Sequence, residues 1–165
     1  MPVSAIRGVN INWQVIGTAG PWVAMTTGGR RGHDEFIPLA HKIAAYGYRV
    51  MLHDRRNTGA SDVLTRWQDI FMAGAHHSVM GVTEDELRSI KVPTLVIPGN
   101  DKVHSSASGL TAHRLVPGST LHRLPIEDQD LPLIPFPAWA AHEAEIARVF
   151  ADFMAHAGAA EHNRR

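Results

Sequence analysis

The order of apolar and polar positions predicts strands and helices that alternate along the chain. Residues 9–18 alternate between apolar and polar side chains, which is typical of a half-exposed edge strand. Short continuous apolar runs are typical of buried strands, and they occupy residues 22–26, 48–52, 94–97 and 120–124. Apolar positions at helical spacing predict helices, which cover residues 34–47, 65–75, 83–90, 105–115 and 137–158. This alternation predicts an α/β fold: a three-layer αβα arrangement with a mostly parallel sheet.

Cap residues set the limits of the predicted helices. Asp34 is a favourable N-cap for the first helix. The run Thr-Glu-Asp-Glu that starts at Thr83 is a capping box, in which a threonine and a glutamate satisfy each other's backbone donors. Gly158 is expected to end the last helix. We therefore expect a single domain over residues 1–157 and a frayed tail over residues 158–165.

Three predicted loops leave the carboxyl ends of strands, and all three combine glycine with polar residues. They are residues 27–33, 54–61 and 99–108. In open α/β sheets, ligands bind beyond the carboxyl ends of the strands. The sequence therefore predicts that a functional site is built from these loops.

Composition narrows the class of protein. The chain has 165 residues, a formal net charge of zero and no cysteine. A neutral chain gives no reason to expect nucleic-acid or membrane partners, and the lack of cysteine excludes disulfides, thiolate metal sites and a cysteine nucleophile. Neither a signal peptide nor an apolar run long enough to span a bilayer is visible in the sequence. These features predict a soluble, cytoplasmic protein.

Five stretches resemble the α/β-hydrolase superfamily and follow the family's order. They are TTGGRRGHDEF from residue 26, GYRVMLHDRRNTGASD from residue 47, IKVPTLVIPGNDKVH from residue 90, PGSTLHRLP from residue 117 and AEIARVFADFM from residue 144. The resemblance implies hydrolysis of an ester, lactone or amide bond in a small-molecule substrate, without a cofactor.

The same resemblance implies roles for individual residues. Gly28, Gly29 and Arg30 lie at the position of the oxyanion loop, whose backbone N–H groups stabilise the charge of the transition state. Asp101 lies at the position of the triad acid, and His104 is the histidine nearest to it in the same loop. The alternatives are a tight strand-to-helix turn at the two glycines and an ordinary turn residue at Asp101.

The middle of the chain departs from the family. The G-x-S-x-G motif, which places a serine nucleophile on a strained turn, does not occur. The nucleophile strand, its helix and the cap are therefore predicted to be missing between Asp62 and Arg66, which gives a reduced α/β-hydrolase fold. The loop after the last strand, residues 125–139, also lacks the family's histidine.

Other residues that could carry chemistry have structural alternatives. Ser105 and Ser106 lie beside His104, but capping of the next helix explains them better than a nucleophile does. Residues 55–57 could bind an anion, but a solvated loop that anchors Asp54 or Asp62 is the alternative interpretation that we favour. The His-Asp and His-His pairs at residues 33–34, 53–54 and 76–77 lack the spacing of known metal motifs. We therefore predict no metal site.

A missing middle would leave the strand at residues 22–26 without a neighbour. Three repairs are open: pairing with residues 94–97, a homodimer through the exposed sheet edge, or a strand from another partner. We expect the first.

Two hypotheses about function follow. The chain is a hydrolase, in which Asp101 and His104 act as acid and base on a non-standard serine or an activated water. Alternatively, it is a catalytically inactive, truncated hydrolase fold that serves as a binding or interaction module.

Overall fold

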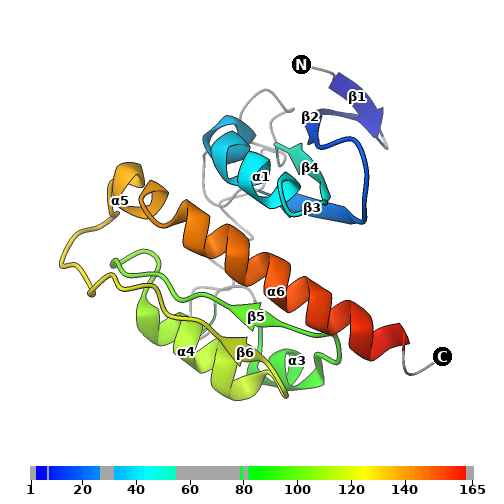
Figure 1. The fold of residues 1–165 in the computed structure, drawn as a ribbon. Coiled ribbons are helices and arrows are strands. Elements are labelled where there is room, and N and C mark those ends of the chain that lie inside the picture. Colours follow the sequence, from blue (N-terminus) through cyan, green and yellow to red (C-terminus); the bar gives the residue numbers. More distant parts are fainter. Residues whose placement is uncertain (1–2, 7, 27–31, 55–78, 80–81, 163–165) are drawn as a thin grey trace. The chain divides into compact units, whose positions relative to one another are not determined.

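The computed structural model describes residues 3–6, 8–26, 32–54, 79 and 82–162 (Figure 1). The chain divides into two compact units, which we describe separately. Unit 1 comprises residues 1–67 and 143–151, and unit 2 comprises residues 68–142 and 152–165. Each unit is therefore built from two separate segments of the chain.

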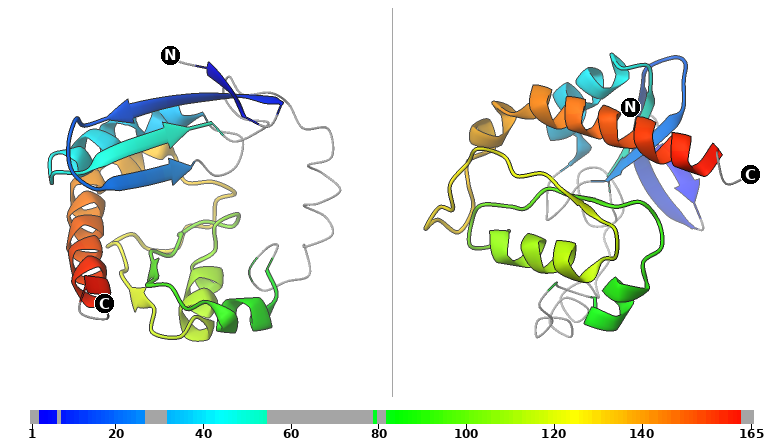
Figure 2. Two further views of the ribbon diagram at one scale, coloured as in Figure 1. Left: turned by 90° about the vertical axis from the view of Figure 1, so that its right-hand side faces the viewer. Right: turned by 60° about the horizontal axis from the view of Figure 1, so that its bottom comes forward.

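Unit 1 is built on a four-stranded sheet. In spatial order the strands are β1 (Val3–Ile6), β2 (Val9–Ile16), β4 (Arg49–His53) and β3 (Trp22–Thr26), as Figure 2 shows. β2 runs antiparallel to both β1 and β4, whereas β3 and β4 are parallel. The sheet is therefore mixed rather than mostly parallel as predicted. Two of its three ladders are antiparallel, because β2 runs against both β1 and β4, and Gly8, at a φ of 76°, permits the tight turn between β1 and β2.

One face of this sheet is covered by the helix that follows β3. A short 3-10 helix, η1 (His33–Phe36), leads into α1 (Ile37–Ala44). Asp34 is therefore not the N-cap of an α-helix as predicted, because a tighter turn occupies that position. Three apolar side chains of α1 are buried and α1 packs on β4, where Val50 and Leu52 are completely buried.

The first part of the last helix also belongs to unit 1. α6 (Glu143–His162) begins with Glu143, whose Oε2 lies 2.6 Å from Nζ of Lys42 on α1. Further along α6, the hydroxyl of Tyr48 donates to the carbonyl oxygen of Ala151 at 3.5 Å. These two contacts join residues that lie about a hundred positions apart in the sequence.

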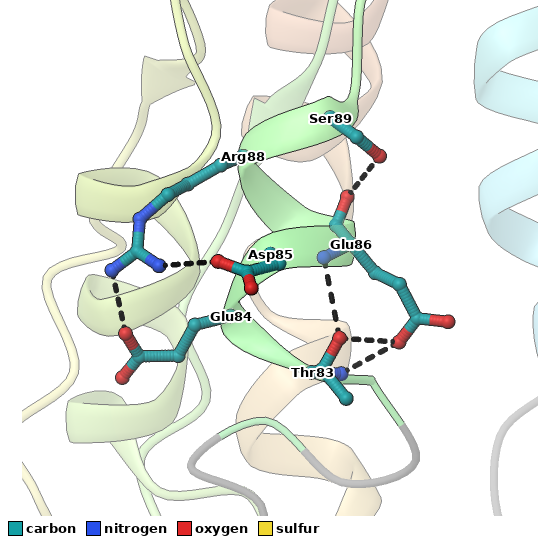
Figure 3. Close-up of polar contacts among 6 residues, drawn as sticks. All are labelled: Thr83, Glu84, Asp85, Glu86, Arg88 and Ser89. Carbon is teal, nitrogen blue, oxygen red and sulfur yellow. Dashed lines mark hydrogen bonds and ion pairs between the residues drawn. The ribbon is translucent and has the colours of Figure 1, made fainter.

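Among its described residues, unit 2 contains two parallel strands, β5 (Leu95–Val96) and β6 (Thr120–Leu121), and three helices shorter than α6. The helices are α3 (Glu84–Ser89), α4 (Ser106–Leu115) and α5 (Phe136–Ala140). α3 opens with the predicted capping box (Figure 3): Thr83 Oγ1 accepts the N–H of Glu86 at 3.2 Å, and Glu86 Oε2 accepts the N–H of Thr83 at 2.8 Å. On the buried side of α3, Leu87 packs with Leu115 and Val116.

Three predictions about the elements are corrected. The predicted helix at residues 137–158 is two helices, α5 and α6, which are separated at Ala141 and His142. α6 continues past Gly158, because that glycine does not take the left-handed conformation of a helix stop. Among the described ladders β5 pairs with β6, so the expected pairing of residues 22–26 with residues 94–97 is not found. The helix predicted at residues 65–75 lies outside the described residues.

Candidate active site

Both predicted catalytic residues lie in the loop that joins β5 to α4 in unit 2. Gly99 begins the turn, and a Cβ atom there would overlap the carbonyl oxygen of His104. Only glycine therefore lets the loop fold back closely enough to bring Asp101 and His104 together.

The carboxylate of Asp101 is buried and accepts hydrogen bonds on both oxygens. Its Oδ1 accepts the backbone N–H of His104 at 2.6 Å and lies 3.1 Å from His104 Nδ1. Its Oδ2 accepts the backbone N–H of Ile134 at 3.0 Å. Burial by itself raises the pKa of Asp101, but the hydrogen bonds from Ile134 and His104 outweigh burial and hold the pKa below its ordinary value. Asp101 is therefore ionised at neutral pH.

An ionised Asp101 fixes the tautomer of the neutral imidazole of His104. Because Nδ1 faces the carboxylate, Nδ1 carries the proton and Nε2 keeps its lone pair. The His104 side chain is 55% exposed, whereas the Asp101 side chain is 3% exposed. The pair therefore combines a buried anion with an accessible base, which is the arrangement of the acid and histidine in a catalytic triad.

The proline-rich loop at residues 125–135 supports the pair. Backbone N–H groups of Lys102 and Val103 donate to carbonyl oxygens of Leu131 and Pro132, at 3.0 and 3.2 Å. Earlier in the loop, the side-chain amide of Asn100 donates to the carbonyl oxygen of Ile126 at 2.7 Å. The contribution of Ile134 was missed in the sequence, because a backbone N–H group can belong to any residue except proline.

Two serines beside His104 have other partners. The Oγ of Ser105 accepts the N–H of Ala107 at 3.2 Å and caps α4, which confirms the structural interpretation of this residue. The Oγ of Ser106 donates to Asp128 Oδ2 at 2.6 Å. Within the described ranges, no hydrogen bond joins a serine hydroxyl to His104. The loop thus brings a buried aspartate and an exposed histidine together, and no described serine hydroxyl lies on that histidine.

Unit 1 contains a second Asp–His pair, which is buried. Asp54 follows β4 and His33 begins η1, and both residues are 1% exposed. Asp54 Oδ1 accepts the backbone N–H of His33 at 2.6 Å and lies 2.9 Å from His33 Nδ1, while Asp54 Oδ2 accepts from Asn12 Nδ2 at 2.8 Å. The loops after two parallel strands therefore meet at one edge of the sheet, as expected, but His33 pairs with Asp54 rather than with its sequence neighbour. The His33 Nε2 atom is buried and has no hydrogen-bond partner among the described residues, so this pair offers no accessible base.

The remaining predicted site residues are not among those described. Gly28, Gly29 and Arg30, the predicted oxyanion residues, lie outside the described residues, and so do residues 55–57. In the part of the chain that the structure describes, no three His, Asp or Glu side chains lie close enough together to hold a metal ion. None of the helices in that part combines the length and apolarity needed to cross a bilayer.

Comparison with known proteins identifies the fold. No protein-family model matches the sequence, and no curated protein matches it. Among solved structures, the enol-lactonase from Burkholderia xenovorans LB400 matches with a TM-score of 0.67 and 12% identity, over 93% of this chain and 100% of that chain. An esterase from Exiguobacterium antarcticum matches with a TM-score of 0.66 and 14% identity, over 92% and 97% of the two chains. Est1E from Butyrivibrio proteoclasticus, solved with ferulic acid bound, matches with a TM-score of 0.66 and 10% identity, over 96% and 100%.

These matches define the fold of the chain. The chain has the α/β-hydrolase fold. The structural matches thus confirm the fold that the sequence resemblance implied. The TM-scores of 0.66–0.67 establish a shared fold, but sequence identities of 10–14% do not establish a shared activity. The activity must therefore be argued from the site.

Proposed function

We propose that this chain hydrolyses carboxylic ester or lactone bonds, or amide bonds, in a small-molecule substrate, with Asp101 and His104 as the acid–base pair. The observation that carries the proposal is the ionised, buried Asp101, which holds His104 through Nδ1 and leaves Nε2 accessible. The enol-lactonase and the esterase from Exiguobacterium antarcticum, which share the fold, act on lactone and ester bonds, as their names state.

The proposed mechanism uses water as the nucleophile. His104 Nε2 takes a proton from a water molecule as the water oxygen attacks the acyl carbon, and Asp101 stabilises the imidazolium that forms. When the tetrahedral intermediate collapses, the bond between the acyl carbon and the leaving group breaks, and His104 returns the proton to the leaving group. Gly28, Gly29 and Arg30 keep the oxyanion role that the family resemblance implies, and this part of the proposal rests on the resemblance alone.

We also propose the reduced form of the fold, a three-layer αβα arrangement that lacks the nucleophile strand and cap. The separation of the described strands into a four-stranded and a two-stranded sheet supports this proposal, because the missing strands would lie between the early and late strands.

The alternative function is that of a binding module without catalysis. It is favoured by the partners of Ser105 and Ser106, which leave the His104 ring without a described serine nucleophile. Both proposals use the same scaffold, so activity measurements must separate them.

Turnover of p-nitrophenyl esters tests the hydrolase proposal. General acid–base catalysis typically contributes about 10²–10⁴-fold, so Asp101→Asn and His104→Gln should each lower kcat/KM by about that factor. His156→Gln is the matched control, because His156 is an exposed histidine on α6 whose Nδ1 contacts a carbonyl oxygen of its own helix. Equal rates for all four proteins would exclude Asp101 and His104 from the mechanism.

A fluorophosphonate probe identifies the nucleophile. Water-based hydrolysis predicts turnover without labelling of any serine. Stoichiometric labelling of one serine would replace the water with that residue and would also refute the binding-module alternative.

A further inference from the structure

The outer edge of β3 has an unusual combination of features for the edge of a sheet. β3 pairs with β4 along its whole length, and among the described ladders it has no partner on the other side. Its sequence, Trp-Val-Ala-Met-Thr, contains no charge and no proline. Natural edge strands usually carry such residues, because they prevent association with another strand. The edge of β3 therefore carries neither of these two kinds of protective residue.

An apolar hollow lies along the same strand. It has a volume of about 280 Å³ and is lined by Trp22, Val23, Ala24 and Met51. Trp22 and Ala24 are opposite Arg49 and Met51 in the β3–β4 register, so they share the face of the sheet that points away from Val50 and Leu52. Trp22, one of the lining residues, is 58% exposed. Large exposed aromatic side chains beside an open strand edge are typical of interaction surfaces.

Arg49 holds the exposed indole in place. Its guanidinium carbon lies 4.4 Å from the centroid of the Trp22 ring, and its Nε donates to the carbonyl oxygen of Gly20 at 2.7 Å. A side chain that is already ordered loses little conformational freedom when a partner covers it. Trp22 is therefore suited to anchor an interface.

We infer that β3 pairs with β3 of a second copy of this chain, in antiparallel register about Ala24. This register places Trp22 opposite Thr26 of the second copy, Val23 opposite Met25, and Ala24 opposite Ala24. All five pairs are uncharged, and aromatic or apolar cross-strand pairs stabilise antiparallel strands. The two-fold arrangement also sets the two Arg49 residues at opposite ends of the paired strands, so their charges do not meet. The two four-stranded sheets become one continuous sheet.

The area available makes this dimer a weak one. Five residues of strand edge and one exposed indole cover far less than the roughly 800 Å² per partner of a standard interface. Self-association should therefore increase with protein concentration and disappear on dilution. The inference is independent of the proposed hydrolase activity.

Single cysteines test the register directly, because the chain has no cysteine of its own. Opposite residues in an antiparallel pair have Cα atoms about 4.5–5.5 Å apart, which lies within the range of about 4.4–6.8 Å that disulfides require. Under mild oxidation, Ala24→Cys should form a disulfide-linked dimer at least about tenfold faster than Ala5→Cys. Ala5 is the matched control, because it is an exposed alanine on β1, the strand at the opposite edge of the same sheet.

Lysine variants give a second, reversible measurement by sedimentation velocity. Ala24→Lys adds the charge that edge strands usually carry and should weaken self-association at least about tenfold, whereas Ala5→Lys should not. Circular dichroism of both lysine variants checks that each is folded. Equal crosslinking at the two positions, a folded monomer at all concentrations, or loss of the dimer only in Ala5→Lys would overturn the inference.

Discussion

The buried carboxylate of Asp54 provides the sharpest test of what stabilises unit 1. Replacement by alanine removes the acceptor of three described hydrogen bonds, from the backbone N–H and Nδ1 of His33 and from Nδ2 of Asn12. All three residues are at most 3% exposed, so water cannot replace the lost acceptor without structural change. A buried donor left without a partner costs about 1–3 kcal/mol, and three donors lose their acceptor here. We expect Asp54→Ala to lower the free energy of unfolding by about 3–5 kcal/mol, which is a large part of the roughly 5–15 kcal/mol of a typical domain.

Urea unfolding followed by circular dichroism and tryptophan fluorescence measures this loss. Asp128→Ala is the matched control, since Asp128 is an exposed aspartate that accepts one described hydrogen bond, from Ser106. We expect the control to lose less than about 1 kcal/mol, as is usual for exposed polar pairs. If Asp54→Ala and Asp128→Ala unfold within about 1 kcal/mol of each other and with equal slopes, the reasoning about the buried network is wrong.

Three further predictions concern unit 2. The pKa of Asp101 is lower in the folded chain than its ordinary value of 3.8. The ionised carboxylate therefore stabilises the fold above pH 3.8, and this stabilisation is lost as the pH falls through the pKa that Asp101 has in the folded chain. Melting temperatures measured across this acidic range should fall less steeply in Asp101→Asn than in the wild type, and parallel curves would refute the assignment. Thr83→Ala removes the side-chain hydrogen bonds that cap α3 and should lower the free energy of unfolding in urea by about 1 kcal/mol. An unchanged urea midpoint would contradict this prediction. Gly99→Ala should destabilise the chain, because its Cβ would overlap the carbonyl oxygen of His104, whereas Gly158→Ala within α6 should stabilise it by about 0.5–1 kcal/mol. Thermal unfolding compares the two alanines, and a shift in the same direction would contradict the steric argument.

The sequence was most informative about features that depend on residues close together in the chain. The capping box at Thr83 and the helix after Ser105 both depend on side chains within a few positions, and both were confirmed. The break between α5 and α6 was missed, because Ala141 and His142 are neither glycine nor proline and give no local signal. β1 was missed because four residues are too few to show a clear alternation of apolar and polar side chains.

The candidate site shows the same division between local and distant information. Asp101 and His104 lie three positions apart, so their contact in one loop was predictable from sequence. The hydrogen bond from Ile134 and the pairing of His33 with Asp54 join segments 33 and 21 positions apart. Such contacts depend on how strands and loops are arranged in space, which a single sequence does not specify by spacing alone.

The way α6 completes unit 1 has a consequence for synthesis of the chain. Lys42 and Tyr48 leave the ribosome about a hundred residues before their partners Glu143 and Ala151. At about 5–20 residues per second, the nascent amino-terminal sheet waits roughly 5–20 s for the helix that closes it. During that interval the surface beside α1 is open to chaperones and to other nascent chains. Translation speed therefore sets how long this half of the protein is vulnerable to aggregation.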